Sequence, residues 1–137
     1  MVDEYNKIYF KQNPRVKKPF LTKPRHPTLN EWTIMKRPYA NALKQKWKTF
    51  GVWWCKKLGY DGLMLEKVKV DITVYQPHHR RGDIDNFCTQ KFLWDAFTEA
   101  RFWVDDDYTH VTEITSRMGY DKDNPRTEII IRTVDDQ

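Results

Sequence analysis

The sequence predicts an α+β fold, a single domain in which a small mixed β-sheet is covered by two main α-helices. Three observations lead to this prediction. An apolar stripe with helical spacing runs from about residue 38 to 58, an alternating apolar and polar segment follows at 66–76, and a second apolar stripe occupies about 86–101. Two strand-like segments follow at about 110–118 and 127–134. Elements patterned in this way bury one face each against a shared core.

The chain of 137 residues has the usual length of one compact domain, so we expect one domain over residues 1–137. Residues 1–37 are expected to form a basic, proline-rich arm that leads into it. Five prolines lie within residues 11–38, which excludes a long helix and favours extended chain. A short strand within 17–23 fits the residue types there, although the alternation is poor.

The first helix has clear boundaries in the sequence. Pro38 suits a first helical position, and Gly59 suits a C-terminal cap. In the second helix, Phe87 and Trp94 fall outside the main apolar stripe, and we expect them to contact a partner subunit. The last two strands are predicted to form an antiparallel hairpin around the turn at 119–125.

Composition limits the compartment and the partner. Lys plus Arg number 24 against 19 Asp plus Glu, and this net charge of +5 favours a polyanionic partner, although charge alone is a weak signal. Cys55 and Cys88 lack zinc-type spacing and are expected to be reduced core thiols, as in intracellular proteins. No leader or membrane-spanning run is seen, so a soluble cytoplasmic protein that does not interact with membranes is expected.

Two acidic clusters stand out in this basic chain. Asp83 and Asp85 follow Arg80 and Arg81, and the acidic run 105–107 comes about twenty residues later. In an extended segment Asp83 and Asp85 would point the same way, roughly 6 to 7 Å apart. Such carboxylates suit a hard divalent ion such as Mg²⁺, with waters and substrate phosphates completing its shell. The two arginines would then bind phosphates.

Each of these residues also has an ordinary structural interpretation. Asp85 could be a helix N-cap and Asp83 a turn residue, and at least one member of 105–107 must be a solvated turn acid. Lys91 and Asp95 have the spacing of a helical ion pair, which weighs about equally with a site role for Lys91. A zinc or HNH-type nuclease site is less favoured because the metal spacing is missing. Its members would be His78, His79, Asn86 and His110.

Several motifs together resemble the RusA family of Holliday junction resolvases. Residues 80–86, Arg-Arg-Gly-Asp-Ile-Asp-Asn, resemble the family's basic residues and Asp-x-Asp-Asn motif. Lys91 stands four residues before Asp95-Ala96-Phe97, as the family's lysine stands before its Asp-Ala-Leu. Residues 102–106 resemble its Gly-x-Trp-x-Asp-Asp turn, and residues 27–30 resemble its Pro-Ser-x-Asn element. The resemblance is good over about 66–107 and loose in the flanks.

The resemblance implies a homodimeric, Mg²⁺-dependent endonuclease, with Mn²⁺ as a substitute ion, that cuts four-way DNA junctions by paired symmetric nicks. Carried across residue by residue, the metal-binding and catalytic aspartates fall on Asp83, Asp85 and Asp106, and the catalytic-site lysine falls on Lys91. Contacts to DNA are expected from Arg80, Arg81, Asn30, Lys17, Lys18 and Arg25.

The chain departs from the family pattern in two places. Lys91 lies six residues beyond Asp85 where the family has four, and we place the two extra residues at the start of the helix. Arg101 stands where the family usually has Gly, and a longer segment follows the acidic run. The third ligand therefore stays open between Asp106 and its neighbours Asp105 and Asp107. Two other functions stay open: a nuclease for flaps or forks, and a catalytically impaired junction-binding protein on the same scaffold.

Overall fold

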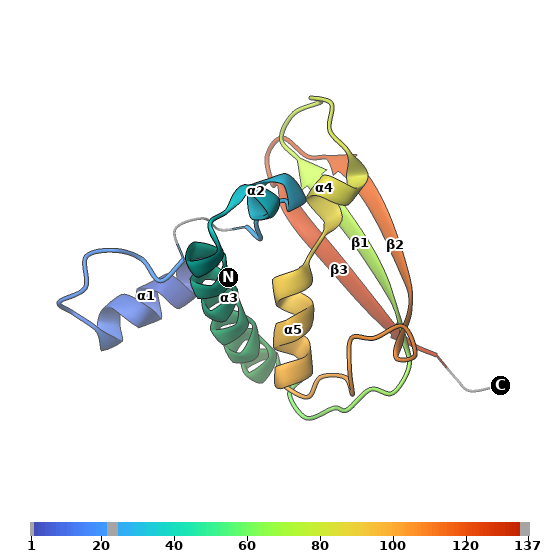
Figure 1. Cartoon of the computed structure of the whole chain (residues 1–137), viewed down its shortest axis with the longest axis horizontal. Helices are drawn as coiled ribbons and strands as arrows, with labels where there is room; N and C mark the ends of the chain where they lie inside the picture. The colour runs from blue at the N-terminus through green and yellow to red at the C-terminus, as the bar shows by residue number, and fades with distance from the viewer. Residues whose placement is uncertain (1, 22–24, 135–137) are drawn as a thin grey trace.

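A computed structural model describes residues 2–21 and 25–134 of the chain (Figure 1). It confirms the α+β class and the small mixed sheet. No helix in the described part of the chain is long and apolar enough to cross a membrane. In chain order the elements are α1 (Val2–Gln12), α2 (Leu29–Ile34), α3 (Arg37–Leu58), β1 (Val68–Gln76), α4 (Ile84–Cys88), α5 (Lys91–Glu99), β2 (Val111–Tyr120) and β3 (Arg126–Thr133).

The sheet has β1 at its centre, with β2 parallel to it on one side and β3 antiparallel on the other. The alternate residues Val68, Val70, Ile72 and Val74 of β1 are buried, as the alternation predicted. The predicted hairpin is wrong, because β2 and β3 each pair with β1 and not with one another. The turn at 121–125 carries the chain across the end of β1, from one of its edges to the other. Both edges of β1 therefore have hydrogen-bond partners.

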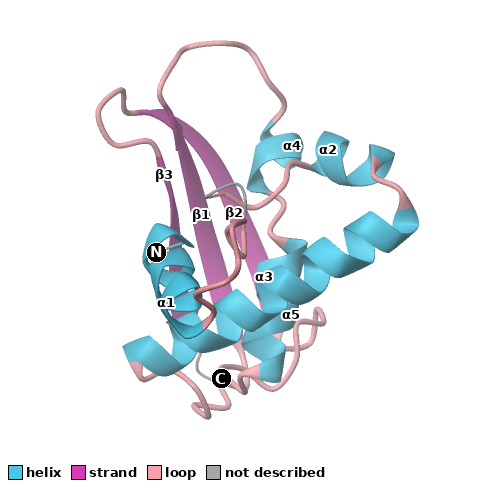
Figure 2. Ribbon diagram, turned by 90° about the vertical axis from the view of Figure 1, so that its left-hand side faces the viewer, coloured by secondary structure: helices cyan, strands magenta, loops and turns pink. Residues whose placement is uncertain are grey.

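The helices lie on one face of the sheet, as Figure 2 shows. Helix α3 agrees with its prediction: Pro38 lies in its first turn, and Gly59 caps it in the left-handed conformation with φ 74°. Helix α3 packs closely on α5, since a Cβ added to Gly51 would lie 2.5 Å from the Cβ of Ala96. A glycine is therefore required where the two helices meet.

The predicted second helix, residues 86–101, is wrong as a single element. It consists of α4 and α5, which are separated by Thr89 and Gln90 in non-helical conformations. The two pieces pack on different neighbours, because α4 contacts β1, β2 and α2 whereas α5 contacts α3. One straight helix could not reach both sets of partners, so tertiary packing overrides the continuous apolar stripe.

The N-terminal region is also more structured than an extended arm. Residues 2–12 form α1, and α2 begins with a capping box. In it the Thr28 side chain accepts from the backbone N–H of Glu31, and the Glu31 carboxylate accepts from the backbone N–H of Thr28. Leu21 and Val2 join Trp47 of α3 in a buried cluster, so this region forms part of the core. Residues 17–21 are not a strand, and the remainder of the strand expected within 17–23 lies outside the described residues.

Four apolar side chains bear on earlier predictions. Cys55 and Cys88 are free and buried, as predicted, and burial raises the pKa of Cys55 to about 11. Phe87 and Trp94 are partly buried and pack against the core cluster of the sheet and helices, and their contact with a partner subunit stays a prediction. Their position outside the main stripe reflects the break between α4 and α5, which turns each helix toward its own neighbours.

Candidate active site

The first acidic pair lies where β1 leads into α4. Asp83 is the N-cap residue, in extended conformation, and Asp85 lies in the first helical turn. The expectation that both lie in one extended segment is therefore wrong for Asp85. Both residues are exposed, and neither side chain forms a hydrogen bond or an ion pair with another residue that the structure describes. Their carboxylate oxygens are therefore available to an ion or to solvent.

Lys91 is the first residue of α5, and it contacts two carboxylates. Its Nζ lies 3.3 Å from Oδ1 of Asp95 and 3.6 Å from Oδ2 of Asp106. The helical ion pair and the long-range contact therefore coexist. Partial burial disfavours the ammonium ion, but Asp95 and Asp106 outweigh burial and raise the pKa of Lys91. Lys91 therefore carries its positive charge at neutral pH.

The three consecutive aspartates have three different roles. Asp107 uses Oδ1 to accept hydrogen bonds from the backbone and hydroxyl of Thr109 and from the backbone of His110, and the Thr109 hydroxyl is the main cause of its lowered pKa. Asp105 Oδ1 accepts a hydrogen bond from the backbone N–H of Asp106 at 2.7 Å. Asp106 is the member that contacts Lys91.

The environment of Asp106 is electrostatically unusual. Desolvation by burial and then the adjacent Asp105 raise the pKa of Asp106, whereas Lys91 lowers it and Asp95 raises it further. Asp95 also lies 3.4 Å from Nζ of Lys44 in α3, a contact that sequence spacing could not reveal. Two lysines and three aspartates therefore meet beside the start of α5, and this group keeps an excess of negative charge that a cation would relieve.

The structure does not bring Asp106 together with Asp83 and Asp85. Because β1 and β2 are parallel, the end of β1 that leads to Asp83 lies opposite the end of the sheet where β2 begins (Figure 1). Among residues 2–21 and 25–134, no three His, Cys, Asp or Glu side chains form a group that could hold a metal ion. The chemistry of the carboxylate oxygens suits Mg²⁺, and the three-aspartate ligand set stays a prediction.

The alternative zinc site has no support among the described residues, because its histidines have separate contacts. His78 Nδ1 accepts from the backbone N–H of Arg80, the His79 ring stacks on Tyr120, and His110 Nδ1 bonds to the carbonyl of Glu66. Each imidazole is thus engaged at a different place in the fold.

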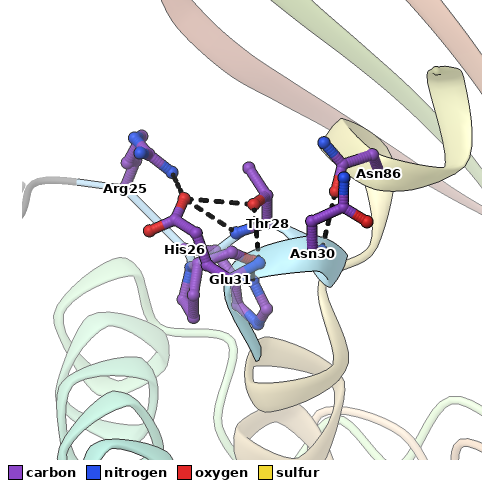
Figure 3. A network of polar contacts seen from close by, with 7 residues as sticks. Arg25, His26, Thr28, Asn30, Glu31 and Asn86 are labelled. Atoms are coloured by element: carbon purple, nitrogen blue, oxygen red, sulfur yellow. Dashed lines mark hydrogen bonds and ion pairs between the residues drawn. The ribbon is translucent and has the colours of Figure 1, made fainter. Parts of the chain in front are cut away.

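The predicted DNA-contacting residues divide into two groups. Arg80 and Arg81 are exposed in the loop after β1, and neither guanidinium pairs with a described carboxylate; Lys17 and Lys18 are also exposed. By contrast, Arg25 forms a 2.7 Å ion pair with Glu31. The backbone N–H of Asn30 donates to the Asn86 side chain, as Figure 3 shows.

Comparison with known proteins agrees with the motifs. The family model described as "Endodeoxyribonuclease RusA" matches residues 8–132. Proteins named crossover junction endodeoxyribonuclease RusA from Escherichia coli (strain K12), Shigella sonnei (strain Ss046) and Enterobacteria phage 82 are each 49% identical over 39 residues. Those matches cover 28% of this chain and 31% of each relative. Since the family model spans nearly the whole chain, the chain belongs to the RusA endodeoxyribonuclease family.

Proposed function

We propose that this chain is a Mg²⁺-dependent, structure-selective endodeoxyribonuclease that resolves four-way DNA junctions by paired symmetric nicks. The observation that carries the proposal is the family match over residues 8–132. Two features of the fold support it. Lys91 contacts Asp106 at the start of α5, and Asp83 and Asp85 at the start of α4 have carboxylates without a partner among the described residues. Branched DNA is the proposed substrate.

In this proposal the chain's own residues position and neutralise the substrate. Asp83, Asp85 and Asp106, which the described structure does not gather into one group, are the proposed ligands of the divalent ion, with Asp105 or Asp107 as the alternative third ligand. When bound, Mg²⁺ or Mn²⁺ would supply an activated water and stabilise charge on the leaving oxygen. Lys91, which remains an ammonium ion, would stabilise charge on the phosphoryl group. Arg80 and Arg81 would hold the sugar-phosphate backbone, as would Lys17 and Lys18, and these contacts carry affinity without sequence information.

The direct test is cleavage of a labelled four-way junction in Mg²⁺ by wild type and by Asp83→Asn. We expect the variant to lose cutting and to keep junction binding, because the substitution removes a proposed ligand and one repulsive charge. Undiminished cutting by the variant would refute the assignment of Asp83. Binding of the junction by wild type without nicks would favour the catalytically impaired alternative, and faster cutting of flaps or forks would favour the other nuclease.

A homodimer belongs to the proposal, because paired nicks require two sites. The outer edge of β2 pairs with no other strand in the described part of the chain. Glu113 and Arg117 flank Thr115 symmetrically and stay about half exposed, although they contact Lys69 and Asp71. Two β2 strands that pair antiparallel about Thr115 would place Glu113 of each copy opposite Arg117 of the other.

Sedimentation tests this arrangement. Wild type is expected at twice the 16.7 kDa chain mass, Arg117→Glu is expected to shift toward the monomer, and the swap of both charges, Glu113→Arg with Arg117→Glu, should restore the dimer. A wild type that sediments as a monomer at the concentrations used for cleavage would exclude the dimer. A dimer that Arg117→Glu leaves unchanged would place the interface elsewhere.

A further inference from the structure

Residues 25–34, which we call the bridging segment, contact the starts of both short helices that carry the proposed site. The segment consists of Arg25, His26, Pro27, the N-cap residue Thr28 and α2. Figure 3 shows its polar contacts with Asn86 of α4 and its internal network. No prediction from sequence gave His26 a role, and Asn86 entered only as the last residue of the Asp-x-Asp-Asn motif and as a member of the less favoured zinc site.

At α4, the contact is made by Asn86, the residue after Asp85. Its Oδ1 accepts a hydrogen bond from the backbone N–H of Asn30 at 2.8 Å. That N–H lies in the first turn of α2, where backbone donors have no partner within the helix. Thr28 Oγ1 accepts from the next such donor, the N–H of Glu31, at 3.2 Å. Asn86 and Thr28 therefore cap α2 together, and the cap links α2 to α4.

At α5, the contact is made by His26. Its Nε2 lies 3.0 Å from the backbone nitrogen of Phe92, the residue after Lys91, and its Nδ1 lies 2.7 Å from the carbonyl oxygen of Pro27. The amide of Phe92 can only donate, so Nε2 accepts and the proton is on Nδ1, which donates to Pro27. The N-cap residue of α5, Gln90, makes no side-chain cap bond of its own.

The imidazole is held rigidly in this position. His26 is buried, with only 9% of its surface exposed, and its ring lies 5.0 Å from that of Phe92 and 5.6 Å from that of Trp47. Burial lowers the pKa of His26 to about 4, so the ring is neutral and Nε2 remains an acceptor at neutral pH. The ion pair between Arg25 and Glu31 joins the residues that precede and follow His26 in the bridging segment.

We propose that His26 and Asn86 are positioning residues: through the bridging segment they fix the start of α5, and hence Lys91, relative to the start of α4, and hence Asp83 and Asp85. The need for such a link follows from the fold. The chain between α4 and α5 is a non-helical break at Thr89 and Gln90, so the helix itself does not set their relative orientation. The proposal rests on the proposed nuclease function.

The test compares single-turnover cleavage of a four-way junction with junction binding in the absence of Mg²⁺. His26→Ala is expected to slow cleavage roughly 10- to 100-fold, the effect of a displacement of about 1 Å, and to leave the dissociation constant nearly unchanged. His26→Gln should restore most of the rate, because its side-chain oxygen can accept from Phe92 where Nε2 does. Asn86→Ala should also slow cleavage. The double variant His26→Ala with Asn86→Ala should slow cleavage by less than the product of the two single fold-changes, since both residues act through one segment.

Asn6→Ala is the matched control for lost stability. Asn6 is also buried, and its side chain makes two hydrogen bonds to the backbone of Leu21 and none to α4 or α5. The Asn6→Ala variant should lower the melting temperature as His26→Ala does and leave the cleavage rate unchanged. Equal slowing by both variants would overturn the positioning role, and so would a failure of His26→Gln to restore the rate in a folded protein.

A readout without cleavage separates this proposal from the nuclease function. In ¹⁵N NMR spectra, His26 should show the Nδ1-protonated neutral tautomer, and His26→Ala should shift the amide signals of Lys91 and Phe92 and, through the segment, that of Asn86. A wild type with these signals and no nuclease activity would refute the function alone. Amide shifts confined to the neighbours of residue 26 would refute the link between the helices.

Discussion

At the scale of single residues, hydrogen bonds distinguish three adjacent aspartates of identical chemistry. Asp107 has one oxygen occupied by three donors of its own turn, which is the arrangement of a turn-stabilising residue. Asp106 is partly buried, with a raised pKa, and contacts Lys91. The choice of third ligand among Asp105, Asp106 and Asp107 stays a prediction, and we keep Asp106 as the proposed ligand because it contacts Lys91.

The first prediction compares two substitutions that remove the same charge. Asp106→Asn should abolish junction cleavage, because it removes the carboxylate beside Lys91. Asp107→Asn should cut nearly as well as wild type, because an asparagine oxygen can accept the same turn hydrogen bonds. Cleavage rates at equal junction occupancy decide the matter. The reverse result, loss with Asp107→Asn alone, would transfer the proposed ligand to Asp107.

The second prediction concerns acid stability and His26. Its folded pKa of about 4 lies below the ordinary 6.5, so the unfolded chain binds a proton that the folded chain excludes. This group therefore makes the free energy of unfolding fall as pH drops from 6.5 to about 4, by roughly 3 kcal/mol in total. Urea unfolding of wild type and His26→Gln at pH 7 and pH 4.5 measures the difference. An equal loss in both proteins would contradict the prediction.

At the scale of elements, the packing of α3 on α5 and the break before α5 determine where Lys91 lies. The apolar stripe at 86–101 predicted the helical conformation of most of its residues correctly, but it gave no sign that Gln90 would be non-helical and buried. Periodicity describes which face of a helix is apolar. It does not describe how many neighbouring elements that face must contact, and α4 and α5 have different ones.

The third prediction tests the contact between these helices. Gly51→Ala should lower the free energy of unfolding by about 1 to 3 kcal/mol, because the new methyl group overlaps Ala96, and this cost exceeds the gain of about 1 kcal/mol in helix propensity. The double variant Gly51→Ala with Ala96→Gly moves the methyl group to the other helix and should recover part of the loss. Thermal or urea unfolding measures both. A more stable Gly51→Ala would show that the helices separate at little cost.

At the scale of the whole molecule, the helices cover one face of the sheet, and the loop after β1 extends beyond one end of it (Figure 1). This loop carries the exposed Arg80 and Arg81. The net charge of +5 favours a polyanion in general, whereas Arg80 and Arg81 would give that attraction a location. Other basic residues have carboxylate partners, as Arg132 and Arg117 have in Asp71. Formal charge alone therefore overstates the cations available to DNA.

The fourth prediction follows from this distribution. The logarithm of the junction-binding constant should fall linearly with the logarithm of salt concentration, and Arg80→Ala or Arg81→Ala should each reduce the slope by about 1. Lys69→Ala is the control, since Lys69 lies at the other end of β1 and pairs with Glu113. Titrations at several salt concentrations measure the slopes. An equal change with Lys69→Ala would mean that the DNA is held by general charge.

The sequence by itself determined the features that depend on neighbours along the chain: the α+β class, the extents of α3 and β1, the cap at Gly59, and the family, through the order of its motifs. The tertiary structure decided which edge of β1 receives β3, where the second helix breaks, and that the N-terminal region belongs to the core. It also decided that Lys91 contacts Asp106 and that His26 caps α5. These features depend on hydrogen-bond edges and packing partners far apart in the sequence, and residue periodicity carries no information about such pairs.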